Sequence, residues 1–98
     1  MVMHVGTARI ILRLPESSSL KDKRQVVRST TERIRNRFNV AIAEIETQDS
    51  WRTATLGLVC VSGDARHTQE MLDKVVSFIE EERLDAEVGD VETELIAL

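Results

Sequence analysis

Pairs of carboxylates spaced two residues apart are the feature of this sequence that most resembles catalytic chemistry. The pairs are Glu44 with Glu46 and Glu92 with Glu94. On an extended strand this spacing places both side chains on one face, as a paired general acid and base would require. Arg9 and Arg13 alternate in the same way near the start of the chain. Ion pairing between neighbouring strands is therefore the simpler interpretation of the acidic pairs.

The other candidates for chemistry stand alone in the sequence. His4 and His67 have no cysteine or carboxylate at metal-ligand spacing. Cys60 lies in an apolar run, where cysteine behaves as a small buried hydrophobe, and no helix start or basic cluster near it favours a thiolate. The four glycines form no phosphate-binding loop. We therefore expect a protein that is not an enzyme, with no catalytic residue, no metal site and no cofactor.

A stripe of basic residues is the most specific candidate for binding. The apolar positions from residue 20 to residue 38 recur at spacings of seven, four, three and four, which predicts one face of a helix: Leu20, Val27, Thr31, Ile34 and Phe38. At 100° per residue, four cations fall within about 60° on one flank of that helix. We call this set the basic flank: Lys21, Arg24, Arg28 and Arg35.

The basic flank has two interpretations. Four cations in a stripe can bind the phosphates of RNA, with an affinity that falls steeply with salt. The alternative is a solvated face partly neutralised by Glu32, which is four residues after Arg28 and three before Arg35. Arg33 and Arg37 belong to the opposite flank of the same helix.

Composition and charge describe one globular domain over residues 1–98. The chain is 42% hydrophobic and 31% charged, and its N-terminal apolar stretch is too short to span a bilayer. A single cysteine cannot form an internal disulfide, so we expect a reducing, cytoplasmic setting. The formal net charge of -4 hides an asymmetry, because residues 1–37 hold nine Lys or Arg against three Asp or Glu, and residues 38–98 hold four against fourteen.

The pattern of elements predicts a fold. Residues 4–14 alternate as a strand packed on one side, residues 39–62 read as a β-hairpin, and residues 86–98 alternate again. Ser19, with Asp22 three residues later, caps the first helix, and Asp64 caps a second one. The order is β-α-β-β-α-β. We predict an α+β, ferredoxin-like fold, a four-stranded antiparallel sheet with two helices on one face.

The sheet face that the helices leave uncovered is called the open face here. We expect it to be part apolar and net acidic, with these residues: Val5, Arg9, Ile11, Arg13, Val40, Ile42, Glu44, Glu46, Val59, Asp90, Glu92 and Glu94. The first and third strands carry no aromatic residue on which an RNA base could stack, so this face favours self-association over RNA. Candidate oligomer contacts are Ile11, Ile42, Val59 and Trp51.

Trp51 is the chain's only tryptophan and stands in a polar stretch, "ETQDSWRTATLG", at residues 46–57. Gln48 and Asp49 suit a turn, so Trp51 is expected at the tip or rim of the hairpin. Two interpretations remain open. The indole folds back over the end of the sheet and shields the core, or it anchors a contact with another subunit.

Five segments carry a family resemblance: "SLKDKR" at 19–24, "RNRFNVAIAE" at 35–44, "QDSW" at 48–51, "ATLG" at 54–57 and "LDKVVSFIE" at 72–80. With these, nearly the whole chain resembles the YlxP-like family, small bacterial proteins with a domain of unknown function. The positions that match the family's pattern are Ser19, Leu20, Lys21, Lys23, Arg24, Arg35, Asn36, Phe38, Asn39, Glu44, Gln48, Asp49 and Trp51. Thr30, Thr31, Ser50 and Thr53 depart from it.

The resemblance implies a ferredoxin-like fold and genes near those for transcription elongation, translation initiation and ribosome maturation. It supplies no catalytic residue. Our first functional hypothesis is an oligomeric accessory protein of translation or ribosome maturation, not an enzyme, that contacts RNA or the ribosome through the basic flank. We expect a homo-oligomer, a dimer or larger. The alternative is a homo-oligomeric module that binds a small molecule or a protein through the open face, and neither hypothesis involves a membrane.

Overall fold

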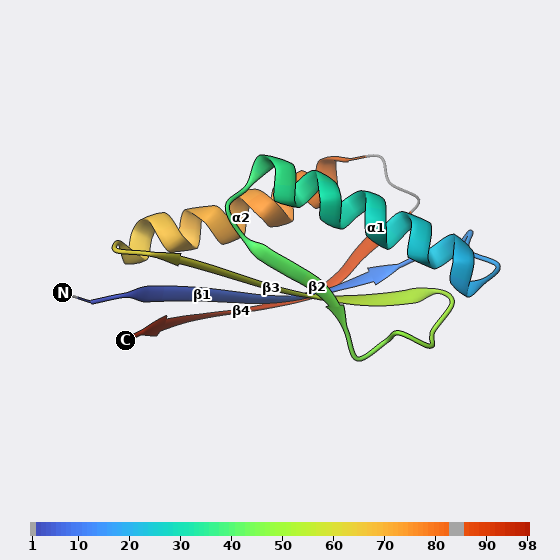
Figure 1. Ribbon diagram of the computed structural model, residues 1–98, viewed down its shortest axis with the longest axis horizontal. Helices are drawn as coiled ribbons and strands as arrows, with labels where there is room; N and C mark the ends of the chain where they lie inside the picture. Colours follow the sequence, from blue (N-terminus) through green and yellow to red (C-terminus); the bar gives the residue numbers. More distant parts are fainter. Residues whose placement is uncertain (1, 83–85) are drawn as a thin grey trace.

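One four-stranded sheet with two helices on a single face makes up the structure. It is a computed structural model that describes residues 2–82 and 86–98. The elements in chain order are β1 (His4–Arg13), α1 (Leu20–Arg37), β2 (Ala41–Ile45), β3 (Thr53–Ser62), α2 (Ala65–Glu81) and β4 (Glu87–Ala97). All pairings are antiparallel, in the order β2-β3-β1-β4 (Figure 1). The predicted β-α-β-β-α-β order and ferredoxin-like α+β fold are confirmed.

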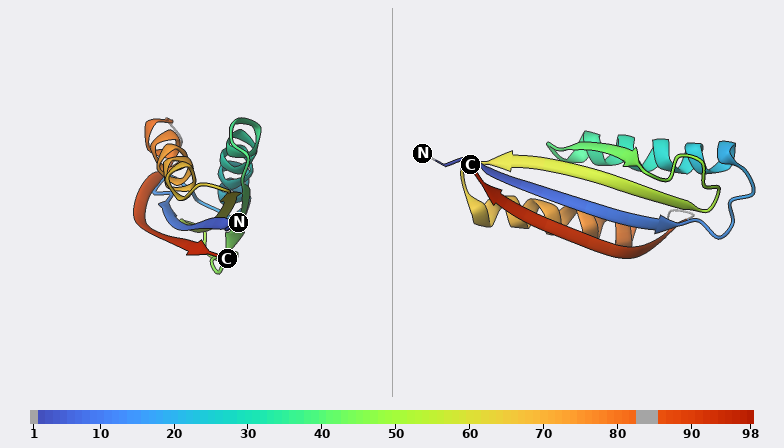
Figure 2. Two further views of the ribbon diagram at one scale, coloured as in Figure 1. Left: turned by 90° about the vertical axis from the view of Figure 1, so that its left-hand side faces the viewer. Right: turned by 90° about the horizontal axis from the view of Figure 1, so that it is seen from below.

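The two helices divide the covered face between them. α1 packs on β2 and β3, whereas α2 packs on β1, β3 and β4. Figure 2 shows the helices side by side above the sheet, with the opposite sheet face free of helices. The outer flank of α1 therefore lies on the side of β2, and the acidic β4 forms the other edge of the sheet.

The core lies between the sheet and the helices, and its pattern follows from strand alternation. β1 buries every second residue, from Ala8 through Ile10 and Leu12, and the chain buries Leu14 just after the strand. β3 and the helices supply the opposing side chains: Ala54, Leu56, Leu58, Cys60, Ile34, Leu72, Val75 and Ile79. α2 approaches Gly6 so closely that a Cβ atom added to this glycine would lie 2.7 Å from Cγ2 of Thr68.

Each helix begins at the residue that its sequence predicts. The Ser19 hydroxyl accepts a hydrogen bond from the Asp22 amide at 3.1 Å, and the Asp64 carboxylate accepts one from the Arg66 amide at 2.9 Å. These bonds satisfy backbone donors that have no partner within the helix. The Asp22 carboxylate also accepts hydrogen bonds from the amide and the hydroxyl of Ser18, so it reaches one residue further back than a standard capping box.

The two ends of the sheet carry different features: paired chain termini at one end and two loops at the other. The amide of Met3 donates to the carbonyl of Leu98, and the amide of Leu98 donates to that of Met3, which joins the outer ends of β1 and β4. The other end carries the loop between β1 and α1 together with the loop of residues 46–52 between β2 and β3 (Figure 1). Within the described residues, neither helix has the length and apolarity needed to cross a membrane.

Candidate functional site

A buried lysine holds α1, β2 and the 46–52 loop together. The Lys23 side chain has no exposed surface, and its amine donates to Oε2 of Glu44 at 2.8 Å. The same amine donates to the carbonyl oxygens of Thr47 at 2.6 Å and Gln48 at 3.3 Å. A buried ammonium group needs both a counter-charge and acceptors for its protons, and Lys23 obtains both from this one turn of the chain.

Further hydrogen bonds fix the 46–52 loop to its surroundings. The Thr47 hydroxyl lies 3.1 Å from the Glu44 carboxylate and accepts the amide proton of Thr55 at 2.7 Å. At the far side of the loop, the Arg52 carbonyl accepts the amide proton of Leu14 at 2.8 Å, and Nε of Arg52 donates to the carbonyl of Ser17 at 3.0 Å. The loop is thus tied to the start of α1 and to the end of β1.

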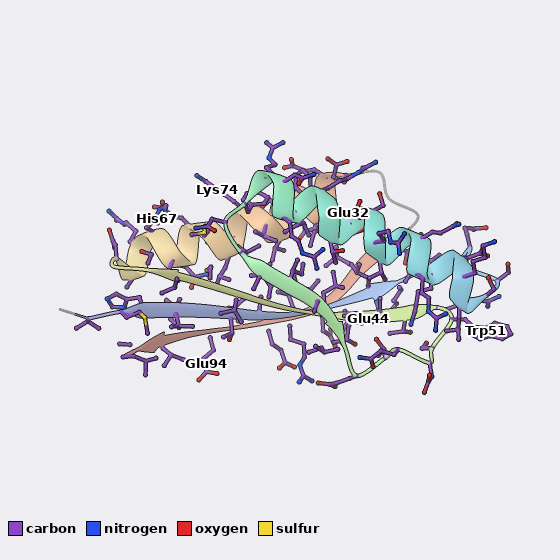
Figure 3. The ribbon with its side chains drawn as sticks, in the orientation of Figure 1. Glu32, Glu44, Trp51, His67, Lys74 and Glu94 are labelled. Carbon is purple, nitrogen blue, oxygen red and sulfur yellow. The ribbon has the colours of Figure 1, made fainter. Side chains whose placement is uncertain are left out.

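Trp51 projects from this fixed loop into solvent. Its side chain lies at the end of the molecule beside the start of α1, pointing away from the sheet (Figure 3). The residue is 55% exposed, so it does not shield the core, and the interpretation of Trp51 as a core lid is wrong. The other two aromatic residues, Phe38 and Phe78, pack edge to face against each other with ring centroids 5.7 Å apart.

The basic flank of α1 carries exposed cations at Lys21, Arg24 and Arg28. Among residues 2–82 and 86–98 only three ion pairs form within 4.0 Å, and none involves these residues or Glu32. Glu32 therefore forms no ion pair within 4.0 Å with Arg28 or Arg35. Lys21, Arg24 and Arg28 thus lie on the β2 side of α1 without a carboxylate partner within 4.0 Å among the described residues.

Arg35, the fourth member of the basic flank, has a structural contact. Its Nη2 donates to the carbonyl of Ile42 at 2.7 Å. β2 is an edge strand, and a free carbonyl on such an edge can pair with another chain, so this bond protects the edge. The opposite flank is also engaged, because Arg33 pairs with Glu82 at 3.1 Å and the Arg37 guanidinium lies 5.1 Å from the Phe78 ring centroid.

The prediction that Ile42 and Glu44 lie on the open face is wrong. Ile42 is only 5% exposed and belongs to the core, Val40 packs against the core, and Glu44 meets Lys23 from α1. The open face instead carries the other set of β2 residues, which are Ala41, Ala43 and Ile45. Glu44 occupies the covered face because Lys23 neutralises it there.

Glu46 reaches the open face through an unusual backbone conformation. It is the only described non-glycine residue with positive φ, at 65°. Left-handed geometry costs a non-glycine residue about 1–2 kcal/mol, and it breaks the alternation that would have placed Glu46 beside Glu44. Glu46 forms an ion pair with Arg9. The interpretation of Glu44 and Glu46 as a pair on one face is therefore wrong, whereas the expected pairing of Arg9 with an acid is confirmed.

The β4 acids take a smaller part in ion pairing than we expected. Glu92 is the register partner of Arg9, yet Arg9 pairs with Glu46. A β-bulge places Gly89 beside Arg13, whose guanidinium carbon would lie 3.1 Å from a Cβ at that position. Arg13 thus lies over a glycine of β4. No ion pair within 4.0 Å joins β1 to the β4 carboxylates among the described residues.

The open face contains a shallow groove whose lining includes several small residues. Its volume is about 660 Å³, and its lining includes Thr7, Ala41, Ala43, Ile45 and Gly57 together with Arg9, Glu92 and Glu94. Toward the chain termini the same face exposes a row of apolar residues, which are Met3, Val59, Val61, Ile96 and Leu98.

The candidate oligomer contacts do not gather in one place. Val59 is exposed on the open face and Ile11 is half-buried there, Ile42 is in the core, and Trp51 lies at the end of the molecule.

Cys60 has the environment of a core residue. It is buried between β3 and α2, its sulfur lies 4.0 Å from the Thr68 carbonyl, and burial raises the pKa of its thiol. A raised pKa disfavours the thiolate that nucleophilic chemistry needs. His67 is exposed and His4 is half-buried, and the described residues contain no group of three side chains placed to bind a metal.

Lys23 is the site residue that the sequence reasoning missed. The apolar spacing of the first helix has a gap of seven between Leu20 and Val27, and Lys23, four residues before Val27, fills that gap on the core-facing side. A lysine at a core position of an amphipathic helix indicates a buried partner, and Glu44 was the acid available to it.

Comparison with known proteins gives a family and a fold. Residues 5–93 match a family model described as "Protein of unknown function (DUF503)". The chain is 36% identical over 76 residues to "Uncharacterized protein YlxP" of Bacillus subtilis (strain 168). This alignment covers 78% of this chain and 83% of that protein. The solved structure of "De novo designed protein Foldit4" aligns with 93% of this chain and 96% of its own, with a TM-score of 0.54 at 14% identity. That last similarity concerns the fold alone.

Proposed function

Since the chain belongs to the DUF503 family, the YlxP-like proteins, we propose that it is a cytoplasmic accessory protein that binds RNA through the basic flank of α1, in ribosome maturation or translation. The observation that carries this proposal is the arrangement of Lys21, Arg24 and Arg28. All three are exposed on one flank, and no carboxylate of the described residues pairs with them within 4.0 Å. Cations left unpaired on one helix face attract phosphate.

The spacing of these cations suits a nucleic acid backbone. Lys21 and Arg28 are seven residues apart, about 10 Å along the helix axis. A single strand in helical form rises about 3.4 Å per nucleotide, so the stripe spans about three nucleotides. Three phosphate contacts on single-stranded RNA predict a salt slope of about -2, hence a roughly 20-fold loss of affinity for a fourfold rise in salt.

We assign no reaction to this surface. Cys60 is buried with a raised pKa, and Glu44 and Glu46 face opposite sides of the sheet, so these residues offer neither a nucleophile nor an acid and base pair. Glu92 and Glu94 do share the open face with Arg9, but both are exposed there. The surface recognises phosphate by charge and position, which is sufficient for a binding protein.

The test compares two variants with the same change in charge. Arg24→Glu with Arg28→Glu should lower affinity for a mixed-sequence single-stranded oligoribonucleotide at least about tenfold at 100 mM salt, and reduce co-sedimentation with ribosomes. The matched control is Arg66→Glu with Lys74→Glu, which reverses two exposed cations of α2. Equal losses in both variants would show a charge effect without a site, and unchanged binding in the first variant would refute the proposal.

A second candidate function, self-association through the open face, is favoured by the exposed apolar row of Met3, Val59, Val61, Ile96 and Leu98. A two-fold pairing of this face would bury the row and bring Arg9 of one copy near Glu92 and Glu94 of the other. Val59→Glu should then shift a dimer to monomer in sedimentation velocity, whereas Val91→Glu, on the helix side of β4, should not. A wild-type protein that sediments as a monomer at tens of micromolar would exclude this candidate.

A further inference from the structure

We propose that Trp51 is a stacking platform for an unpaired base of single-stranded RNA whose phosphates lie along the basic flank of α1. This inference rests on the proposed RNA binding and adds the residue that contacts a base. Among the tryptophan and phenylalanine rings of the chain only the indole is exposed, because Phe38 and Phe78 are half-buried and pack against each other.

The exposure of Trp51 is the first observation. The residue is 55% exposed at the end of the molecule, although the apolar core lies only a few residues away at Ala54 and Leu56. A large aromatic side chain gains free energy by burial, so a chain that keeps its only tryptophan in solvent leaves that gain available for a partner.

The hydrogen bonding of the loop is the second observation. Lys23 holds the carbonyls of Thr47 and Gln48, the Ser50 amide donates to the Thr47 carbonyl, and Arg52 is bonded through its carbonyl and its Nε. The residues on both sides of Trp51, Ser50 and Arg52, are thus hydrogen-bonded to other parts of the chain. A ring presented on a fixed backbone loses less conformational entropy on binding than one on a mobile loop.

The position of Trp51 relative to the cations is the third observation. The Lys23 amine that holds the loop belongs to the first turn of α1, between Lys21 and Arg24 in sequence. Arg52, next to Trp51, is exposed and bonded to Ser17, two residues before the N-cap of α1. The ring therefore stands at the end of the cationic stripe, where a strand that follows α1 would reach it (Figure 3).

The surroundings of Trp51 favour RNA over a protein partner. An aromatic anchor of a protein interface lies in an apolar patch that excludes water. Here the exposed residues beside Trp51 in the loop are polar or charged, namely Gln48, Asp49 and Arg52, and Arg52 is bonded to Ser17 next to the exposed Glu16. The exposed apolar row lies toward the chain termini. Cations beside an aromatic face are the chemistry of single-stranded nucleic acid binding.

Trp51 emission provides a direct test, because no other tryptophan contributes to it. Titration with oligouridine and oligoadenosine 12-mers should quench the emission as binding saturates. Trp51→Leu should weaken binding about 5- to 150-fold, the range equivalent to about 1–3 kcal/mol for one stacked base, and Trp51→Phe should retain more than half of the binding free energy that Trp51→Leu loses. The salt slope should stay unchanged in both variants, whereas Arg24→Glu with Arg28→Glu lowers it.

The outcomes separate this inference from the proposal beneath it. Suppose that the wild-type protein binds RNA and that the charge reversals weaken this binding. If Trp51→Leu then binds RNA as tightly as wild type, and RNA does not quench the emission of the wild-type protein, stacking on Trp51 is wrong but binding by the basic flank is supported. If wild-type protein binds neither oligonucleotide, the proposed function fails and stacking fails with it. If Trp51→Leu leaves RNA affinity unchanged and instead dissociates an oligomer, Trp51 is a protein contact and the inference is overturned.

Discussion

Lys23 shows how a charged residue can serve as a core residue. Its aliphatic stem occupies a position that an apolar side chain would take in an ordinary amphipathic helix, and its amine is surrounded by a carboxylate and backbone carbonyls. Such an ion pair contributes little net free energy relative to a well-packed apolar pair, but breaking it leaves a charge without a partner. The role of the Lys23 amine here is to position the 46–52 loop, because it binds the carbonyls of Thr47 and Gln48.

Lys23→Met is therefore expected to be strongly destabilising. It keeps the length of the stem but leaves Glu44, whose side chain is 14% exposed, and the loop carbonyls without their donor. We expect the free energy of unfolding in urea to fall by about 3–5 kcal/mol. The control is Lys21→Met, on the exposed flank of the same helix, with an effect within about 0.5 kcal/mol.

The double variant Lys23→Met with Glu44→Leu adds a second check. It removes the orphaned carboxylate and should recover part of the loss, but not the part due to the carbonyls of Thr47 and Gln48. Equal stability of Lys23→Met and Lys21→Met would contradict the buried contacts.

At the scale of elements, the start of α1 makes stability depend on pH. Hydrogen bonds from the Ser18 hydroxyl and then the Ser18 amide lower the pKa of Asp22 below its ordinary value of 3.8. The ionised carboxylate therefore stabilises the folded chain, fully above the unfolded pKa, and this stabilisation is lost as pH falls through the lowered folded pKa.

The prediction concerns the difference between pH 7 and pH 2.5 in thermal unfolding. Asp22→Asn should show a smaller fall in melting temperature over this range than wild type, because it lacks the carboxylate that protonates. Ser18→Ala, which removes the first of the two donors, should give an intermediate fall. A wild-type pH dependence retained in Asp22→Asn would show that the cap does not contribute.

Elements were largely predictable because each carries its own periodicity and cap. Alternation in β1 and the Ser19 and Asp64 caps place three of the elements without any tertiary information. The phase of β2 was not predictable in this way, since its set of Ala41, Ala43 and Ile45 is apolar, whereas the other set, with Ile42 and Glu44, combines an apolar residue with an acid. Which set faces α1 depends on Lys23, a contact between residues 21 positions apart.

The candidate site was predictable in composition but not in arrangement. All four residues of the basic flank, which helical spacing predicted, are exposed, but that spacing could not show that Arg35 alone of the four donates a side-chain hydrogen bond, to the Ile42 carbonyl, among the described residues. Nor could the polar residues around Trp51 decide between a lid and an exposed ring. That choice depends on the path of the 46–52 loop, which Lys23 and Arg52 determine together.

At the scale of the whole molecule, charge is separated across the sheet. The basic flank lies on the β2 side and Glu87, Asp90, Glu92 and Glu94 lie on β4, the opposite edge. Three strand spacings separate these edges, about 14 Å or more. Screening reduces interactions beyond about 8 Å at 0.15 M salt, but only beyond about 30 Å at 0.01 M.

Neutralising the acidic edge should thus affect RNA binding only at low salt. Glu92→Gln with Glu94→Gln should raise the association rate several-fold at 10 mM salt and leave it nearly unchanged at 150 mM, as stopped-flow quenching of Trp51 would measure. Arg24→Glu with Arg28→Glu should lower affinity at both salt concentrations. An effect of the glutamine variant that persists at 150 mM would place the acids next to the bound RNA.

Because the Lys23 amine is buried, chemical modification of this residue reports whether the chain is folded. The sequence has three lysines, and Lys21 and Lys74 are exposed, so an acylating reagent reaches both in the native protein. The Lys23 amine is enclosed and hydrogen-bonded, and acylation there requires the 46–52 loop to open or the chain to be unfolded. An acetyl group found on Lys23 in cells would therefore show that the 46–52 loop had opened or that the chain was unfolded when the group was attached. Once attached, the acetyl group would prevent the loop from closing.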